Sequence, residues 1–241
     1  ICMVVKTQLT SERAKGGQKE SVEFLLTSHP LDCPICDKGG ECPLQNLTME
    51  HGPGKSRFIF DEKQHLAKHV PLGELIWLDR ERCIQCGRCV RFQSDIASEA
   101  VLGFDERGRA TQIVTFSEPG FDSVFSGNTT DICPVGALTT ADFRFGARPW
   151  ELDASASVCA QCPVGCNITF NTRREAKADG KSVIKRVMPR QKYAGTGGTS
   201  LAAGAGTWLD QNSIAPGDRS GGVIAGGAIN IKADKPVPVK I

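Results

Sequence analysis

Long hydrophobic runs are missing from this sequence of 241 residues. The longest apolar stretches are LIWL at 75–78 and FLL at 24–26, whereas a membrane-spanning helix requires about 20 apolar residues. We therefore expect no membrane-spanning helix. The first residues, ICMVVKTQ, also lack an initiator Met, a basic start and an apolar core. They predict an N-terminally truncated fragment and no secretory signal.

An excess of charge of either sign is missing as well. The 29 basic and 27 acidic residues leave a formal net charge of +2, which gives no argument for binding nucleic acid or anionic lipid. No Gly-rich phosphate loop precedes a helix, and no serine or cysteine nucleophile is arranged with a histidine. We therefore expect no catalytic residue and no nucleic-acid partner.

Cysteine, in contrast, is abundant, with 11 residues. Without a secretory signal we expect these cysteines in a reducing compartment, where such clusters bind metal more often than they form disulfides. Structural zinc sites usually combine two separated pairs, whereas three close cysteines can reach three corners of a cubane iron-sulfur cluster and need a fourth ligand. The sequence holds three such triplets: Cys33, Cys36 and Cys42; Cys83, Cys86 and Cys89; and Cys159, Cys162 and Cys166.

The middle triplet, CIQCGRC at 83–89, has a candidate fourth ligand in Cys133 of DICPVGAL, where Pro134 and Gly136 suit a turn folded against a cluster. The spacing resembles that of bacterial ferredoxins, in which proline also follows the fourth cysteine. It predicts an all-cysteine cubane cluster, with zinc or plain buried thiols as alternatives. Four nearby arginines would offset the charge of a buried cluster or form a solvated basic face. They are Arg80, Arg82, Arg88 and Arg91.

The first triplet lies in HPLDCPICDKGGEC, residues 29–42, where His29 is the candidate fourth ligand. A helix expected at 18–28 should stop before Pro30, because proline disfavours helical geometry in the preceding residue. His29 would then project from the helix end into the cysteine loop. A neutral imidazole in place of a thiolate should raise the reduction potential, as it does in Rieske centres. A capping or surface histidine is the alternative.

Periodicity predicts a few more elements in an α+β fold. Residues 89–98 read as a short helix. VLGF at 101–104 and QIVTF at 112–116 suggest two strands, joined through 106–108. NITFNTR and KSVIKRVM flank residues 178–180 and predict a β-hairpin.

Five stretches occur in a fixed order between about residues 3 and 190: HPLDCPICDKGGECPLQNLTMEHG, LDRERCIQCGRCVRF, FSGNTTDICPVGAL, FRFGARPWEL and CAQCPVGCNI. In order and spacing they resemble the large iron-sulfur subunit of bacterial NADH:quinone oxidoreductase, respiratory complex I. The resemblance implies one 4Fe-4S cluster on His29, Cys33, Cys36 and Cys42, which we call the histidine-type site. It implies a second 4Fe-4S cluster on Cys83, Cys86, Cys89 and Cys133, which we call the all-cysteine site.

The resemblance also implies a role and partners. The chain would relay electrons, which leave NADH through flavin on a neighbouring subunit and continue towards quinone. Its partners would be the flavin- and NADH-binding subunit and the quinone-proximal iron-sulfur subunit of the peripheral arm. The location would be peripheral, on the cytoplasmic side of the bacterial inner membrane, with membrane contact only through the complex.

We expect a small, loop-rich, ferredoxin-type iron-sulfur module followed by the first β-elements of a molybdopterin-oxidoreductase-like domain. The expected regions are a remnant of a truncated 2Fe-2S domain at 1–15, a histidine-ligated 4Fe-4S domain at 16–65, an all-cysteine 4Fe-4S domain at 66–150, the start of the molybdopterin-oxidoreductase-like domain at 151–191, and a disordered Gly/Ala-rich tail at 192–241.

The sequence departs from the family at three points. Cys2 lies near the expected last 2Fe-2S ligand, but its context, ICMVV, does not fit and we do not assign it. No cysteine follows Cys166, so an additional cluster on the third triplet would be incomplete in this chain. The third departure begins at about Lys192, where a frame-shifted end or a genuine linker would explain the loss of resemblance. Two other functions stay open: a relay subunit of an NAD-linked hydrogenase or formate dehydrogenase, and a zinc-binding interaction module.

Overall fold

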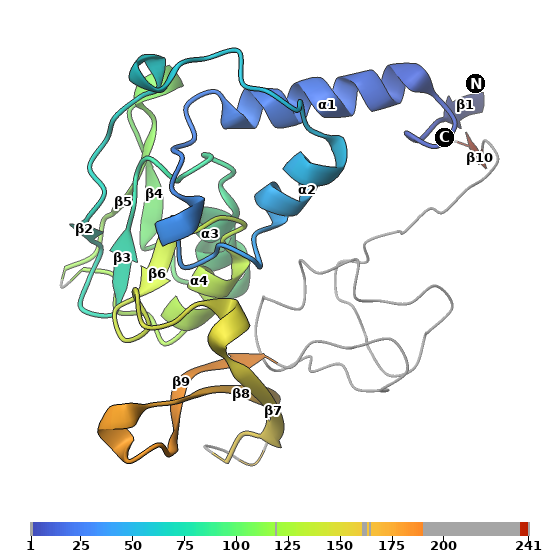
Figure 1. Cartoon of the computed structure of the whole chain (residues 1–241). Coiled ribbons are helices and arrows are strands. Elements are labelled where there is room, and N and C mark those ends of the chain that lie inside the picture. Colours follow the sequence, from blue (N-terminus) through green and yellow to red (C-terminus); the bar gives the residue numbers. More distant parts are fainter. Residues whose placement is uncertain (1, 119, 161–162, 164, 190–236, 241) are drawn as a thin grey trace.

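The computed structural model describes residues 2–118, 120–160, 163, 165–189 and 237–240. After the short strand β1 (Cys2–Val5), the long helix α1 (Glu12–Leu26) runs along one side of the molecule, and α2 (Pro43–His51) follows (Figure 1). The hydroxyl of Ser11 accepts a hydrogen bond from the N–H of Ala14 at 3.4 Å and caps α1. The helix therefore begins earlier than periodicity predicted, and it ends before Pro30 as expected.

A small antiparallel sheet forms the centre of the iron-sulfur region. Its strand order is β2 (Val70–Pro71), β3 (Ile76–Leu78) and β6 (Leu138–Thr140). The register pairs Ile76 with Thr140, so the sheet joins segments that are far apart in the sequence. The sequence did not predict these strands, because two or three residues are too few to show an alternating pattern.

The elements around this sheet confirm several predictions. The strands β4 (Leu102–Asp105) and β5 (Gln112–Thr115) form the expected antiparallel pair. The helix expected at 89–98 is α3 (Arg88–Arg91), which continues as the π-helical segment η3 (Phe92–Ile96). The helix α4 (Ser126–Ile132), which was not predicted, leads directly into Cys133.

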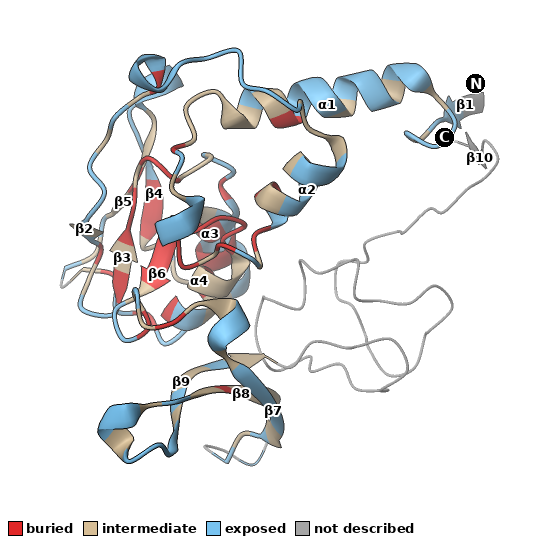
Figure 2. Ribbon diagram, in the orientation of Figure 1, coloured by how far each residue is buried: buried red, intermediate tan, exposed pale blue. Residues whose placement is uncertain are grey.

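A second antiparallel sheet lies beyond the iron-sulfur region in Figure 1. It has the strand order β7 (Asp153–Val158), β8 (Asn167–Arg174) and β9 (Ser182–Pro189). The predicted hairpin is therefore confirmed as β8 and β9. In its turn, Asp179 and Gly180 have φ of 52° and 72°, and Gly tolerates this left-handed conformation without strain. Figure 2 shows that these strands are mostly exposed or half-buried.

The remaining short elements are single turns and one terminal strand. The strand β10 (Val237–Lys240) pairs antiparallel with β1. The rest of the tail predicted at 192–241 lies outside the described residues. The 3-10 turns are η1 (Cys33–Ile35), η2 (Phe60–Glu62), η4 (Gly108–Ala110), η5 (Pro149–Glu151) and η6 (Ala176–Ala178).

The buried core lies around the first sheet, where Figure 2 shows β3 and β6 largely buried. Ile76, Leu78 and Phe121 are each no more than 1% exposed. Three candidate ligands, Cys42, Cys89 and Cys133, belong to the same core. The α+β prediction is thus confirmed. None of the helices in the described ranges is long and apolar enough to cross a membrane.

Candidate iron-sulfur cluster sites

The four thiols of the all-cysteine site line a single cavity. Cys83 and Cys86 lie in the loop after β3, Cys89 lies in α3, and Cys133 follows α4. The cavity has a volume of about 20 Å³. Its walls are mainly apolar and include Leu78, Ile84, Ile113, Val135, Ala137 and Leu138. The fold therefore brings together the four cysteines that the sequence grouped.

The loop that carries Cys83 and Cys86 is tightly curled. Gln85 and Gly87 have φ of 55° and 70°, in the left-handed region. The N–H of Gln85 donates to Sγ of Cys83 at 3.4 Å. A Cβ on Gly87 would lie 3.3 Å from Cζ of Phe104, so both backbone conformation and space favour glycine there. The backbone thus presents a donor to a sulfur that would be negatively charged as a ligand.

The acidity of these thiols reflects their surroundings. Burial, together with the neighbouring thiolates, raises the pKa of Cys83 to about 11 and that of Cys89 to about 12. Burial also raises the pKa of Cys86. Several negative charges in one apolar cavity would repel one another, whereas a cation-containing cluster would offset that repulsion. This donor set fits a 4Fe-4S cluster with four thiolate ligands.

The three cysteines of the histidine-type site also lie close together. Cys33 is exposed in η1, whereas Cys36 and Cys42 are buried, and Cys42 directly precedes α2. Burial raises the pKa of Cys36 and of Cys42. The Cys33 thiolate raises the first value further, and the Cys36 thiolate raises the second. These effects place the three sulfurs within electrostatic reach of one another.

His29 is half-buried near the end of α1 and is neutral at pH 7. Burial lowers the pKa of its imidazole to about 4, and the cations of Lys63 and Arg82 contribute. The neutral ring is the form that binds metals. Its Nδ1 is buried and has no hydrogen-bond partner among the described residues. This unsatisfied nitrogen is what supports His29 as a ligand.

The two sites share one wall, formed by residues 133–136. Cys133 is a candidate ligand of the all-cysteine site, and Pro134 lines its cavity. On the other side, Sγ of Cys42 donates to the carbonyl oxygen of Pro134 at 3.5 Å. Sγ of Cys36 leaves no room for a Cβ on Gly136. The glycine that the sequence assigned to a turn therefore brings the backbone against a sulfur of the other site.

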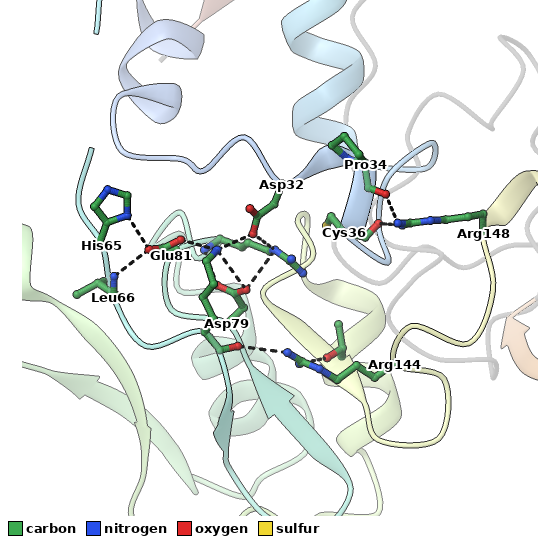
Figure 3. A network of polar contacts seen from close by, with 12 residues as sticks. Asp32, Pro34, Cys36, His65, Leu66, Asp79, Glu81, Arg144 and Arg148 are labelled. Carbon is green, nitrogen blue, oxygen red and sulfur yellow. Dashed lines mark hydrogen bonds and ion pairs between the residues drawn. The ribbon is translucent and has the colours of Figure 1, made fainter. Parts of the chain in front are cut away.

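A charged network lies beside the histidine-type site (Figure 3). Nε of Arg82 lies 2.9 Å from Oδ2 of Asp32 and 3.2 Å from Oδ2 of Asp79. The side chains of Arg82 and Asp79 are only 3% and 1% exposed. Lys68 joins the network through its Nζ, 2.6 Å from Oδ2 of Asp32. Because Asp32 precedes Cys33, and Arg82 lies next to another candidate ligand in sequence, the network ties the two ligand segments together.

The arginines predicted to surround the middle triplet have different roles. Arg82 pairs with Asp32 and Asp79 beside the histidine-type site, and its charge lowers the pKa of Cys36. The charge of Arg88 lowers the pKa of Cys86. Arg91 is 82% exposed and pairs with Asp95, as a solvated residue does. Sequence spacing cannot reveal which groups each arginine side chain faces, since this depends on how the loop folds.

The third triplet is described in part. Cys159 follows β7 and Cys166 precedes β8, and the N–H of the first donates to the carbonyl oxygen of the second at 2.8 Å. Cys162 lies outside the described residues.

Within the described ranges, no three His, Cys, Asp or Glu side chains are arranged to hold a metal ion. The cluster ligand sets therefore remain predictions.

Sequence reasoning also missed a segment that contacts the histidine-type site. FRFGARPWEL was part of the resemblance, but no residue in it received a role. Arg148 in this stretch donates from Nη1 to the carbonyl oxygen of Cys36 at 2.8 Å. The two residues are 112 positions apart, so only the fold could reveal the contact.

Two family models match the chain. The NADH-ubiquinone oxidoreductase-G iron-sulfur binding region matches residues 18–57. The ferredoxin-like domain of NADH-quinone oxidoreductase subunit 3 matches residues 73–139. The first range contains the histidine-type site, and the second contains the all-cysteine site.

Curated relatives match a larger part of the chain. The G subunit of NADH-quinone oxidoreductase of Streptomyces coelicolor is 51% identical over 172 residues, which are 71% of this chain and 20% of the relative. NADH-quinone oxidoreductase subunit 3 of Thermus thermophilus is 48% identical over 71% of this chain and 23% of its own length. The 78 kDa subunit of mitochondrial NADH-ubiquinone oxidoreductase of Neurospora crassa is 45% identical over 78% of this chain and 24% of its own length. The chain thus spans about a fifth to a quarter of these relatives.

Among solved structures, the chain matches a crystal structure of an NAD+-reducing NiFe-hydrogenase in its H2-reduced state. The TM-score is 0.49 and the identity 30%, over 57% of this chain and 59% of that chain. The family assignment rests on the sequence matches, which include both candidate sites. The chain belongs to the family of the iron-sulfur subunit, named G or 3, of NADH-quinone oxidoreductase.

Proposed function

We propose that the chain is part of an electron relay in NADH:quinone oxidoreductase, carrying electrons one at a time from NADH and flavin towards quinone. One 4Fe-4S cluster would occupy the histidine-type site, and a second would occupy the all-cysteine site. The chain itself would bind no substrate.

The shared wall at residues 133–136 is the observation that carries this proposal. The backbone that provides Cys133 to one site contacts Cys36 and Cys42 of the other. Two redox groups held on opposite sides of so short a segment would lie close enough to exchange electrons. A zinc-binding module would not need two metal sites placed in this way.

The residues around each site would adjust the electron affinity of its cluster. A bound 4Fe-4S cluster supplies one-electron chemistry, and the protein sets its potential through ligand charge, hydrogen bonds and solvent exposure. At the all-cysteine site, the apolar side chains of Leu78 and Ile113 line the cavity. At the histidine-type site, Arg82 places a buried cation beside Cys36. Such a cation favours the reduced cluster, because reduction adds a negative charge.

We base the proposed partners and location on the resemblance to the large iron-sulfur subunit of bacterial complex I. The relatives are named as subunits of NADH-quinone and NADH-ubiquinone oxidoreductases. We infer contacts with the flavin- and NADH-binding subunit and with the quinone-proximal iron-sulfur subunit. The complex would hold the chain peripherally on the cytoplasmic side of the bacterial inner membrane. Residues 151–191 would begin a molybdopterin-oxidoreductase-like domain.

A relay subunit of an NAD-linked hydrogenase or formate dehydrogenase is the alternative. Iron-only hydrogenases would add a ferredoxin run of the form C-x2-C-x2-C-x3-C-P after the first triplet. Here Cys89 is followed by a long gap before Cys133. This spacing favours the NADH:quinone oxidoreductase family.

Anaerobic reconstitution with iron and sulfide tests the proposed function. We expect about eight irons per chain, four in each cluster, and two interacting signals in the EPR spectrum of the dithionite-reduced protein. His29→Ala should remove or alter one signal and leave the other. Stoichiometric zinc without a reducible cluster would show that the chain is no relay.

A further inference from the structure

The ligand loop of the histidine-type site is held by a segment far along the chain, residues 144–151, which we call the clamp segment. Its central side chain is Arg148, whose Nη1 donates to the carbonyl oxygen of Cys36 at 2.8 Å. Nη2 of the same guanidinium donates to the carbonyl oxygen of Pro34. Figure 3 shows the Arg148 side chain pointing towards the carbonyls of both Pro34 and Cys36. One rigid, planar group thus binds two peptide units of the ligand loop.

Two further contacts hold the loop between Cys36 and Cys42. The N–H of Phe145 donates to Oδ1 of Asp37 at 3.0 Å. Gly40 has a φ of 92°, and a Cβ there would lie 3.2 Å from Cζ3 of Trp150. The clamp segment therefore contacts the loop at four residues, Pro34, Cys36, Asp37 and Gly40.

These contacts orient the peptide groups of the loop. The carbonyl of Cys36 accepts from Arg148 and from the N–H of Gly39 at 2.9 Å. The backbone N–H of Lys38, in contrast, is directed towards the Cys36 thiol. Holding carbonyl oxygens away from the sulfurs, with an N–H turned towards them, suits ligands that would be anionic in a cluster.

We propose that Arg148 is a positioning residue of the histidine-type site, which shapes the loop from Pro34 to Gly40 so that Cys36 and Cys42 bind one cluster. This inference rests on the proposed function. The all-cysteine site has no contact with the Arg148 side chain among the described hydrogen bonds and ion pairs, so its cluster serves as an internal reference.

The test compares Arg148→Gln and Arg148→Lys with the wild type, each as the full 241-residue chain reconstituted anaerobically. The measurements are the rate of iron release to a chelator and the midpoint potential of each cluster, followed by EPR. In Arg148→Gln we expect the histidine-type cluster to be lost about tenfold faster. This rate change corresponds to a decrease of about 1.4 kcal/mol in the activation free energy of cluster loss. Its potential should shift, while the all-cysteine cluster keeps its rate and potential. The rate of cluster loss in Arg148→Lys should lie between those of the wild type and Arg148→Gln, because an ammonium group keeps the charge but lacks the planar pair of donors of a guanidinium.

Trp150→Ala is a second variant that is safe for folding, since Trp150 is 69% exposed. It should speed loss of the same cluster by a smaller factor. Arg109→Gln is the matched control, because its guanidinium also donates to a backbone carbonyl, that of Glu62 at 3.4 Å, but at an exposed position and without a described hydrogen bond to a candidate ligand. It should change neither cluster.

Equal loss of both clusters in Arg148→Gln, or no change in either, would overturn the positioning role while the relay stands. A wild-type chain that binds no reducible cluster would overturn both.

Discussion

The all-cysteine site lies in an apolar cavity, whereas the histidine-type site lies against charged groups. Leu78, Ile113 and Val135 surround the first set of sulfurs. Arg82 and Arg148 contact or lie beside the ligand loop of the second. The packing of the central sheet shapes the first site, and long-range polar contacts shape the second. Sites of similar ligand chemistry should therefore respond to different substitutions.

Removal of iron and sulfide should have the largest effect. We expect the metal-free chain to lose cooperative unfolding, because structural metals can contribute roughly 10 kcal/mol in small domains. Residues 18–57 should lose more protection than residues 73–139, which contain the buried Ile76, Leu78 and Phe121. Hydrogen exchange and urea unfolding measure both effects. Cooperative unfolding of the metal-free protein would contradict this expectation.

Arg82→Met should be the most damaging single substitution considered for the charged region. It leaves the carboxylate of Asp79, which is 1% exposed, without its buried cation. Breaking such a buried pair costs about 3–5 kcal/mol. Urea unfolding of the reconstituted chain gives the value. Arg107→Met, at an exposed position, is the control and should change the free energy of unfolding by no more than about 0.5 kcal/mol. An equal loss of stability in both variants would mean that the ion pairs of Arg82 do not stabilise the fold.

His29→Cys should lower the midpoint potential of the histidine-type cluster. A thiolate adds one negative charge where the imidazole is neutral, and this disfavours reduction. A shift of about 59 mV is a tenfold change in a one-electron equilibrium. EPR-monitored redox titration measures it, with the all-cysteine cluster as the reference. An unchanged potential on a cluster that still assembles would remove His29 from the ligand set.

Ile113→Val should have the smallest effect and should act on the apolar site. Ile113 is 2% exposed and lines the cavity of the all-cysteine site. Removing one buried methylene costs about 1 kcal/mol. Urea unfolding should detect this loss, and the histidine-type cluster should keep its potential. Ile184→Val, at a residue 54% exposed, serves as the control and should be nearly neutral.

Much of the fold near the ligands followed from local sequence. The hairpin of β8 and β9, the pair of β4 and β5, and the end of α1 before Pro30 were all predicted, because turn residues and periodicity act over a few positions. The sheet of β2, β3 and β6 was not predicted. Its strands are stabilised by burial against distant segments, which no local pattern records.

Cysteine spacing by itself grouped the cysteines of the two candidate ligand sets, since close triplets and a remote C-P motif are typical of cubane iron-sulfur clusters. The tertiary structure decided what surrounds each set. It turned the Arg82 side chain towards Cys36, brought Gly136 against the same sulfur, and carried Arg148 to the ligand loop. These contacts join residues tens to more than 100 positions apart, and their geometry depends on the packing of the whole core.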